Sequence, residues 1–427
     1  MKKRKILVML GAFVLVTAMS FSIHYHYQQK NQQPYLTIMG YINAADGLGR
    51  QPIELIKTLK DDVSISFVPT ENQMMLKDLS SDVVKIIKKK HKKLGRVIIF
   101  EDCVWLPGVN KYEKLKTPVR DDQIRIAYSM FESTRIPPEW ALIFNSYFDA
   151  IVVPDKFLID VYKNSGVKIP IFELPLGLDF NQFLESPLKE KKNDPFVFSN
   201  LSTCIDRKNH LMLINAFAKA FGNDPKVVLK INARYGDAET LKATTKELSI
   251  LNYDNIHFTQ LRLDKKAYFD VFSATDCYVS LSKAEGFSIQ PREAMALGIP
   301  VIATNNTGQT TICETNLVRA VNSKIEKPAL YFWNSYYGKS FDCTEEEAVV
   351  ALLDVYHNYE KYLKNGNAAR NWVRQYELKE LWGLYKTLIK PSRIKLGSEN
   401  KITEDCLIIT EKKLYEKYKK IAGCSAE

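Results

Sequence analysis

The chain has 427 residues, of which 46% are hydrophobic and 26% charged. These values are ordinary for a globular protein large enough for two domains with their own cores. Lysine and arginine outnumber the acids by 60 to 49, a formal charge of +11, which favours anionic partners such as nucleotide sugars and lipid headgroups. Without zinc-knuckle spacing or an RNA-binding aromatic signature, we expect no nucleic acid partner. Seven scattered cysteines never form Cys-x-x-Cys, which argues against a disulfide scaffold or a zinc site.

The N-terminal segment predicts a membrane anchor. Lys2-Lys3-Arg4-Lys5 precedes an uncharged run from Ile6 to Ile23, which as a helix would reach roughly 27 Å, close to the thickness of a bilayer's hydrocarbon core. A cleaved signal peptide is the alternative, because Ala18-Met19-Ser20 resembles a small-x-small cleavage site. We favour the uncleaved anchor, since the apolar run exceeds a usual signal core, and assign residues 1–33 to anchor and stem.

From residue 34 to residue 345, short apolar runs alternate with amphipathic stretches, the pattern of parallel sheets covered by helices on both faces. This pattern predicts an α/β fold with two doubly wound, Rossmann-like domains, 34–180 and 181–345. The expected strands are 35–39, 63–68, 97–100, 124–128, 150–153, 171–174, 196–199, 227–231, 256–259, 277–281 and 301–303. Cys277 is expected in the core. A Pro- and Lys-rich interval, 175–195, predicts a linker, and helices with a basic tail are expected over 346–427.

Ligands of open α/β sheets collect at the carboxyl ends of the strands, so the loops that follow strands are the candidates for a site. In "GYINAADGLGRQPIELI", Gly47 and Gly49 allow a close backbone approach to an anion before a helix. Pro52 occupies the place of the third glycine of a dinucleotide fingerprint. A plain tight turn therefore remains the alternative for this loop.

In "SNLSTCIDRKNHLMLINAF", Arg207 and Lys208 precede an amphipathic helix. Basic groups there oppose the helix macrodipole, so they are better explained by a bound phosphate than by structure; a solvated basic turn is the alternative. We expect His210 on the helix surface.

In "AEGFSIQPREAMALGIPVIATN", Glu285 and Glu293 stand on either side of a strand-to-helix turn. A carboxylate can accept two hydrogen bonds from vicinal hydroxyls, so the two acids could hold the two sugar rings of a nucleotide sugar. The backbone at Gly286 would then meet the phosphates. A capping acid with a solvated helix glutamate is the alternative, but it does not account for the apolar surroundings of Glu293.

These motifs together resemble the GT-B glycosyltransferases of the large retaining family 4. "SLSKAEGFSIQPREAMALGIPVIATN" is similar to the E-x7-E signature of that family, and "DRKNHLMLINAF" to its phosphate segment. "GYINAADGLGR" and "FESTRIPPEW…FDAIVVPDKF…SGVKIPIFELPLGLD" match further motifs in the same order, so that the likeness extends over most of residues 38–375.

The resemblance implies a role for each matching residue. Arg207 and Lys208 would neutralise the donor diphosphate as it leaves, and Glu293 would bind the nucleotide ribose. Glu285 would hold the donor sugar. The remaining donor contacts would come from loop backbone and small side chains, at Gly47, Gly49, Gly286, Phe287 and Ser288. The reaction would retain anomeric configuration without a protein nucleophile, through stabilisation of the leaving phosphate.

Two family histidines are missing, one in the region 128–132 and one in Pro175-Leu176-Gly177-Leu178-Asp179, and a family glutamate is replaced around Thr307-Gly308-Gln309-Thr310. The acceptor side is therefore open, with Glu132 and Asp102 as candidates for contact. We expect a glycan or lipid-linked acceptor. No cofactor is expected besides the donor, and no metal, because the sequence contains no Asp-x-Asp. A sugar-nucleotide epimerase and an inactive sugar-binding scaffold are the alternatives.

The sequons Asn200-Leu201-Ser202 and Asn305-Asn306-Thr307 fall in the expected active-site loops, where a glycan would obstruct binding. This weighs against a Golgi-type lumenal enzyme and favours a bacterial enzyme at the cytoplasmic face of the inner membrane, held by an apolar run that inserts without crossing.

Overall fold

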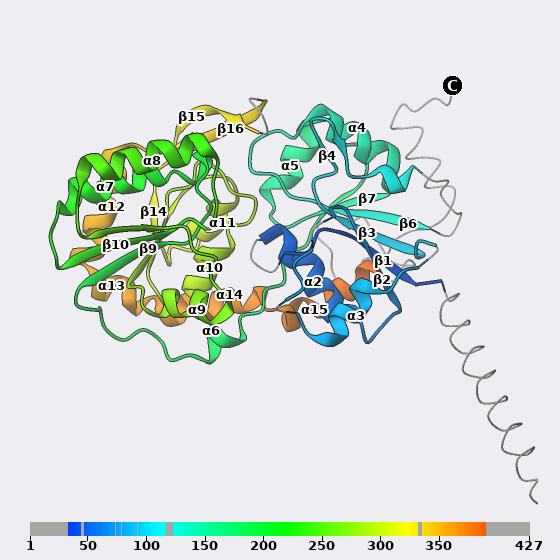
Figure 1. Cartoon of the computed structure of the whole chain (residues 1–427), viewed down its shortest axis with the longest axis horizontal. Helices are drawn as coiled ribbons and strands as arrows, with labels where there is room; N and C mark the ends of the chain where they lie inside the picture. Colours follow the sequence, from blue (N-terminus) through cyan, green and yellow to red (C-terminus); the bar gives the residue numbers. More distant parts are fainter. Residues whose placement is uncertain are drawn as a thin grey trace, which may run out of the picture.

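The structure, a computed structural model, describes residues 33–389 except 44–46, 73, 78, 92, 117–122 and 332–334. Two lobes lie side by side, each with a parallel sheet covered by helices (Figure 1). Residues 1–32, which hold the predicted anchor, and the tail beyond residue 389 lie outside the described residues. Over the range that is described, no helix has both the length and the apolar character needed to cross a membrane.

The N-terminal domain is built on a six-stranded parallel sheet of order β2-β1-β3-β6-β7-β8. Side chains alternate between two apolar cores, one on each face: Ile38 and Ile99 lie in one core, Met39 and Phe100 in the other. The strands are β1 Leu36–Gly40, β2 Ile65–Pro69, β3 Val97–Glu101, β6 Ile124–Tyr128, β7 Ala150–Val153 and β8 Ile171–Glu173. The helices are α2 Gly47–Leu59, α3 Ser81–Lys88, α4 Pro138–Tyr147 and α5 Phe157–Asn164, with a small hairpin, β4 Trp105–Leu106 and β5 Val109–Asn110.

The C-terminal domain repeats this plan with the sheet order β11-β10-β9-β12-β13-β14. The strands are β9 Phe196–Asn200, β10 Val227–Asn232, β11 Ile256–Thr259, β12 Cys277–Ser280, β13 Val301–Thr304 and β14 Arg319–Val321. The helices are α7 His210–Phe221, α8 Ala238–Leu251, α9 Lys265–Ser273, α10 Ile289–Ala296 and α11 Thr310–Cys313. All the strands that the sequence predicted are present within two residues of their expected bounds. Cys277 is fully buried, as expected.

The predicted linker is packed rather than loose. It contains a short helix, α6 Asn181–Glu185, and its apolar side chains Leu176, Leu178, Phe180 and Phe183 are buried in the core. Leu178 N donates to Tyr376 O at 2.8 Å, so the linker is bonded to the C-terminal part of the chain. The interval 175–195 is therefore the first of two crossings between the domains.

The predicted fourth segment, 346–427, is divided between the two domains as far as it is described. Helix α12 Glu345–His357 packs on α7, whereas α15 Leu378–Leu388 crosses back and packs on α2. Tyr385 of α15 accepts a hydrogen bond from Gly177 N and donates one to Pro175 O, both at 2.8 Å. Two further helices, α13 Tyr359–Lys364 and α14 Gly366–Val373, connect them.

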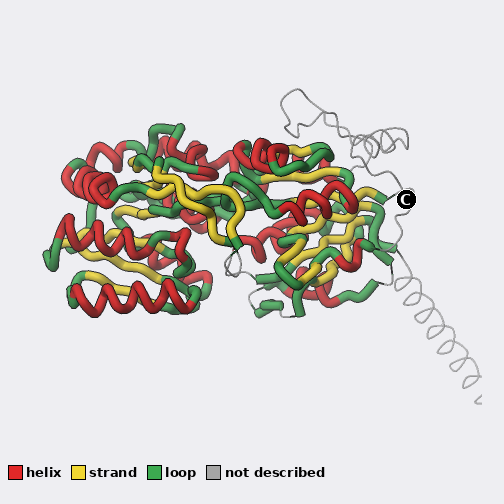
Figure 2. The backbone as a smooth tube through the Cα atoms, turned by 90° about the horizontal axis from the view of Figure 1, so that it is seen from above, coloured by secondary structure: helices red, strands yellow, loops and turns green. Residues whose placement is uncertain are grey.

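A hairpin that the sequence did not predict, β15 Ile325–Leu330 and β16 Tyr336–Asp342, extends from the C-terminal domain toward the other domain (Figures 1 and 2). Lys339 N donates to Thr134 Oγ1 at 2.9 Å, and Ser133 Oγ donates to Tyr337 O at 2.6 Å. Strand β15 carries Lys, Glu and Pro and is largely exposed, so it lacks the apolar pattern on which the other strands were predicted.

Candidate active site

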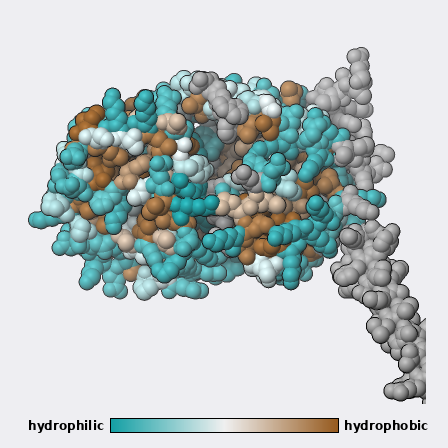
Figure 3. All heavy atoms as spheres, in the orientation of Figure 1, coloured by the Kyte–Doolittle hydropathy of each residue, from teal (hydrophilic) through white to brown (hydrophobic). Residues whose placement is uncertain are grey.

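A cleft with a volume of about 1030 Å³ separates the two domains. In Figure 3 the surface is hollowed between the two lobes. The cleft is lined by residues that follow the strands of both sheets, among them Gly47, Glu132, Arg207, Lys208, Glu285, Gly286, Phe287, Ser288 and Glu293. All the predicted site residues except Gly49 are therefore brought to one cavity. The carboxyl ends of both sheets meet there, as expected for open α/β sheets.

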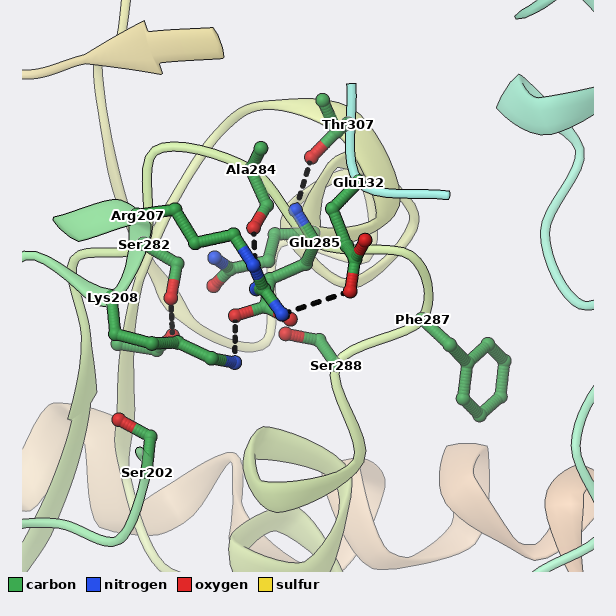
Figure 4. Close-up of polar contacts among 12 residues, drawn as sticks. Glu132, Ser202, Arg207, Lys208, Ser282, Ala284, Glu285, Phe287, Ser288 and Thr307 are labelled. Carbon is green, nitrogen blue, oxygen red and sulfur yellow. Dashed lines mark hydrogen bonds and ion pairs between the residues drawn. The ribbon is translucent and has the colours of Figure 1, made fainter. Parts of the chain in front are cut away.

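Arg207, Lys208 and Glu285 form one ion-paired cluster (Figure 4). Lys208 Nζ pairs with one carboxylate oxygen of Glu285, and Arg207 Nη1 lies 3.2 Å from the other. Both cations come from a 3-10 turn, Asp206–Lys208, that precedes α7. Burial raises the pKa of Glu285, but Lys208 and Arg207 outweigh that effect and lower the pKa to about 2. The glutamate is therefore ionised at neutral pH.

The loop after β12 offers three backbone donors. The amides of Gly286, Phe287 and Ser288 donate to no protein acceptor within the described residues. Thr307 and Gly308 brace this loop, since Glu285 N donates to Thr307 Oγ1 at 2.8 Å and Gly308 N donates to Glu285 O at 2.9 Å. Free amides held at the start of α10 are suited to bind an anion.

The side chain of Phe287 points away from the charged cluster (Figure 4). Its ring lies 3.8 Å from the guanidinium carbon of Arg292 and packs edge-on against Tyr376. The ring of Phe287 is therefore engaged with Arg292 and Tyr376, and the backbone is the part of Phe287 that remains for a ligand in the cleft.

Glu293, the second predicted acid, lies on α10 with its side chain 1% exposed. Its two oxygens are held by protein donors: Arg50 Nη1 lies 3.0 Å from Oε1, and the Tyr268 hydroxyl lies 2.5 Å from Oε2. The sequence interpretation missed Arg50. The signal was present, because Arg50 is a basic residue in the first turn of α2, the same anomaly that identified Arg207 and Lys208.

The two glycines of the first loop have different surroundings. Gly47 lines the cleft, and a Cβ there would lie 3.0 Å from Ile289 of the other domain. Gly49 does not line the cleft; a Cβ there would lie 2.6 Å from Asn43 N. The structure thus gives Gly49 a packing role, and the predicted approach to an anion falls to Gly47.

On the N-terminal side of the cleft, Asp102 and Glu132 differ in how many of their carboxylate oxygens have a protein partner. Asp102 is buried and accepts hydrogen bonds from Lys111 Nζ at 2.9 Å, Thr70 Oγ1 at 2.5 Å and its neighbouring amide. Burial raises the pKa of Asp102 although Lys111 acts against this effect. Glu132 is one-third exposed and pairs through Oε1 with Arg207 Nη2 at 2.9 Å, while its Oε2 has no partner in the described part of the chain. Of the two candidates, Glu132 is the one that can contact a ligand.

His210 was expected on the helix surface, and this was wrong. It is 1% exposed, and its Nε2 lies 3.1 Å from Ser202 Oγ and 3.2 Å from Asn200 Oδ1. Burial, followed by the charge of Lys208, lowers its pKa to about 4. His210 is a neutral buried residue behind the cation cluster.

Residues 182–322 match the family model of the glycosyl transferases of group 1. An uncharacterised glycosyltransferase of Methanocaldococcus jannaschii is 29% identical over 67% of this chain. The match covers 62% of that protein, so the chain spans less than two thirds of this curated relative. The family match and the relative support the group 1 glycosyltransferase family.

Solved structures show the fold. The chain superposes on sucrose-phosphate synthase from Thermosynechococcus elongatus with a TM-score of 0.63, at 14% identity, over 84% of this chain and 98% of that one. HepE of Anabaena, solved with UDP and glucose, gives a TM-score of 0.55 at 13% identity, over 82% of this chain and 97% of that one. The architecture is therefore that of the GT-B glycosyltransferases, with two Rossmann-like domains facing a cleft.

Proposed function

We propose that this chain is a glycosyltransferase that moves a sugar from a nucleotide-diphosphate sugar to a glycan or lipid-linked acceptor, with retention of anomeric configuration. The observation that carries the proposal is the pairing of Arg207 and Lys208 with Glu285 beside the free amides of residues 286–288. Cations and amide donors converge on one place in the cleft, as stabilisation of a departing diphosphate requires. The group 1 family match over the same segment supports this assignment.

In this proposal Arg207 and Lys208 carry the main catalytic effect. Negative charge grows on the diphosphate as the glycosidic bond breaks, and two cations fixed beforehand stabilise that charge without reorganisation. The role of Glu285 is to hold hydroxyls of the donor sugar while keeping both cations in place. The reaction needs no protein nucleophile if the acceptor hydroxyl attacks from the face that the diphosphate leaves.

The acceptor is proposed to enter from the N-terminal side, next to Glu132. This carboxylate has one oxygen free for a hydroxyl hydrogen bond, as far as the described residues extend. Asp102 is proposed to have a structural role, because its oxygens are already occupied by Lys111 and Thr70.

Incubation with a panel of UDP-, GDP- and dTDP-sugars tests the proposal. We expect slow release of a nucleoside diphosphate from one donor class, since water can replace the acceptor hydroxyl at a low rate when the acceptor is absent. Recovery of an epimerised sugar nucleotide would instead identify an epimerase. Tight binding without any turnover would identify a sugar-binding scaffold. The UDP bound by HepE makes the UDP-sugars the first to try.

The anchor is the second part of the proposal: the uncharged run 6–23 is proposed to hold the enzyme at the cytoplasmic face of a bacterial inner membrane. Every proposed ligand residue lies beyond residue 46, so removal of residues 1–33 should give a soluble protein that keeps donor hydrolysis. Centrifugation with membranes measures the loss of association. If the truncated protein still pellets, the attachment lies elsewhere in the chain.

A further inference from the structure

The carboxylate of Glu293 is occupied by a residue from the opposite domain. Arg50 belongs to α2 of the N-terminal domain, yet its guanidinium lies 3.0 Å from Oε1 of Glu293 on α10. The Tyr268 hydroxyl takes the other oxygen at 2.5 Å. Ribose hydroxyls that bind Glu293 must therefore compete with both donors, and the competition with Arg50 takes place across the domain boundary.

Arg50 also lines the cleft that contains the expected phosphate site. It lies three residues after Gly47 in the first turn of α2, and both residues line the cleft together with Ser288. In Figure 1 the start of α2 lies on the side of its domain that faces the other lobe. The Arg50 side chain is 25% exposed and so remains accessible from the cleft, whereas that of Glu293 is 1% exposed.

The three cations nearest the proposed donor contacts are each paired with carboxylates of the protein. Arg207 and Lys208 pair with Glu285, Arg207 also pairs with Glu132, and Arg50 pairs with Glu293. A nucleoside diphosphate brings at least two negative charges to this set and competes with the carboxylates for these cations. Arg50 is the cation whose exchange frees the carboxylate proposed for the ribose. A guanidinium also forms strong paired hydrogen bonds with phosphate oxygens.

We propose that Arg50 is a donor-binding residue that releases Glu293 and moves to a phosphate of the nucleotide when the donor enters. The Arg50–Glu293 pair then acts as a gate: it holds the two domains together until the donor arrives, and only a ligand that carries both ribose and phosphate replaces both partners. This inference rests on the proposed function, and it adds a selectivity for diphosphates that comes from the N-terminal domain.

Calorimetric titration with UDP, GDP and dTDP, and with uridine, guanosine and thymidine as their phosphate-free counterparts, tests the gate. Arg50→Ala should weaken binding of the diphosphate tenfold or more, because a charge-assisted phosphate contact is lost. Binding of the nucleoside should stay unchanged or become tighter, because Glu293 has lost its competitor. Arg50→Lys should recover part of the diphosphate affinity, since the charge remains while the planar fork is lost.

Glu293→Gln is the complementary variant. The ribose loses its carboxylate, so nucleoside binding should fall, but Arg50 is freed in advance and the preference for diphosphate over nucleoside should widen. Lys60→Ala is the matched control: Lys60 directly follows α2, pairs with Asp61 and Asp82 and does not line the cleft. It should change neither affinity. Melting temperatures of all variants establish that they are folded.

Each result has a defined meaning. If the wild-type protein binds none of UDP, GDP and dTDP, the proposed function fails together with the gate. If the wild type binds a diphosphate and Arg50→Ala keeps the same preference for it over the nucleoside, the gate alone is overturned. If Arg50→Ala and Arg50→Lys weaken diphosphate and nucleoside equally, Arg50 only positions Glu293, and the phosphate contact is overturned.

Discussion

The two walls of the cleft are built in different ways. On the C-terminal wall, Arg207, Lys208 and Glu285 satisfy one another, and their loop is braced from within the same domain by Thr307. On the N-terminal wall, Glu132 has an oxygen without a partner among the described residues. Part of this wall comes from the other domain, because Tyr331 follows β15 and lines the cleft.

This difference suggests that the C-terminal wall binds a phosphate in a fixed geometry, whereas the N-terminal wall can vary with the acceptor. The C-terminal wall holds Lys208 and Glu285 through contacts within its own domain, as the stabilisation of a phosphate requires, and only Arg207 of this cluster also pairs across the cleft, with Glu132. The N-terminal wall is complete only when the hairpin β15–β16 is docked. The ring of Tyr331 packs against Phe131 at 4.9 Å and against Trp140 at 6.2 Å between ring centroids. We therefore expect substitutions on the C-terminal wall to affect the chemical step. Substitutions on the N-terminal wall should affect docking of the hairpin and binding of the acceptor.

The largest effect on activity is expected from substitutions on the C-terminal wall. Arg207→Ala combined with Lys208→Ala should reduce kcat about a hundredfold or more, because stabilisation that grows in the transition state is lost. Lys208→Arg alone should cost less, since the charge remains. Donor hydrolysis under saturating donor gives kcat, and competition binding should show that the diphosphate loses its advantage over the nucleoside.

The control for this pair is Lys242→Ala with Lys246→Ala, two exposed cations on α8 of the same domain. They should leave turnover unchanged. Near-wild-type turnover in the Arg207 and Lys208 double variant would overturn the assignment of the catalytic effect to these two cations.

The sequence predicted which residues gather on the C-terminal wall, and physical reasons explain why. Short apolar strands with a fixed alternation identified both sheets, and the cations before α7 stood out because they oppose the macrodipole. The paired acids Glu285 and Glu293 stood out because they lie on either side of a strand-to-helix turn, where ligands of open α/β sheets collect. All of these signals are local in the sequence.

The N-terminal wall could not be predicted in the same way, because its contacts join residues that are far apart in the sequence. Tyr331 and Phe131 meet only through the docked hairpin, and nothing local in the exposed strand β15 predicts a partner. His210 was misplaced for a related reason. Its ring is hydrogen-bonded to Asn200 at the end of β9 and to Ser202 in the loop that follows, and these contacts depend on the folded loop.

A smaller effect, on the free energy of unfolding, is expected where the hairpin β15–β16 docks on the N-terminal wall. Gly338 has φ +70°, and a Cβ there would lie 2.5 Å from Arg135 N. Gly338→Ala should therefore destabilise the protein by about 2–4 kcal/mol, through backbone strain and overpacking. UDP or GDP affinity should stay within about threefold, because the cations of the other wall are untouched. Thermal unfolding and calorimetric titration measure the two quantities.

Gly166→Ala is the matched control for the hairpin, since Gly166 has φ +96° but a Cβ added there would meet no atom within 4 Å. It should show the backbone strain alone, about 1–2 kcal/mol. Equal losses in the two variants would mean that the hairpin is not docked in solution, and the contrast between the walls would then disappear.

The smallest effect concerns the pH dependence of stability and arises at His210, behind the C-terminal wall. His210 is buried as a neutral ring, with its pKa lowered from 6.5 to about 4 by burial and then by Lys208. The unfolded chain therefore binds a proton on this residue at a higher pH than the folded chain does. The stability that the neutral ring provides is complete above pH 6.5 and is lost as the pH falls toward 4. Between pH 7 and pH 5.5 this loss should be about 1 kcal/mol.

His210→Gln can keep the hydrogen bond to Asn200 and should remove this part of the pH dependence, as measured by urea unfolding at both pH values. His257→Gln, at an exposed position, should leave the dependence unchanged. If His210→Gln shows the same slope as the wild type, His210 is not held neutral, and the cation cluster does not extend its influence behind the wall.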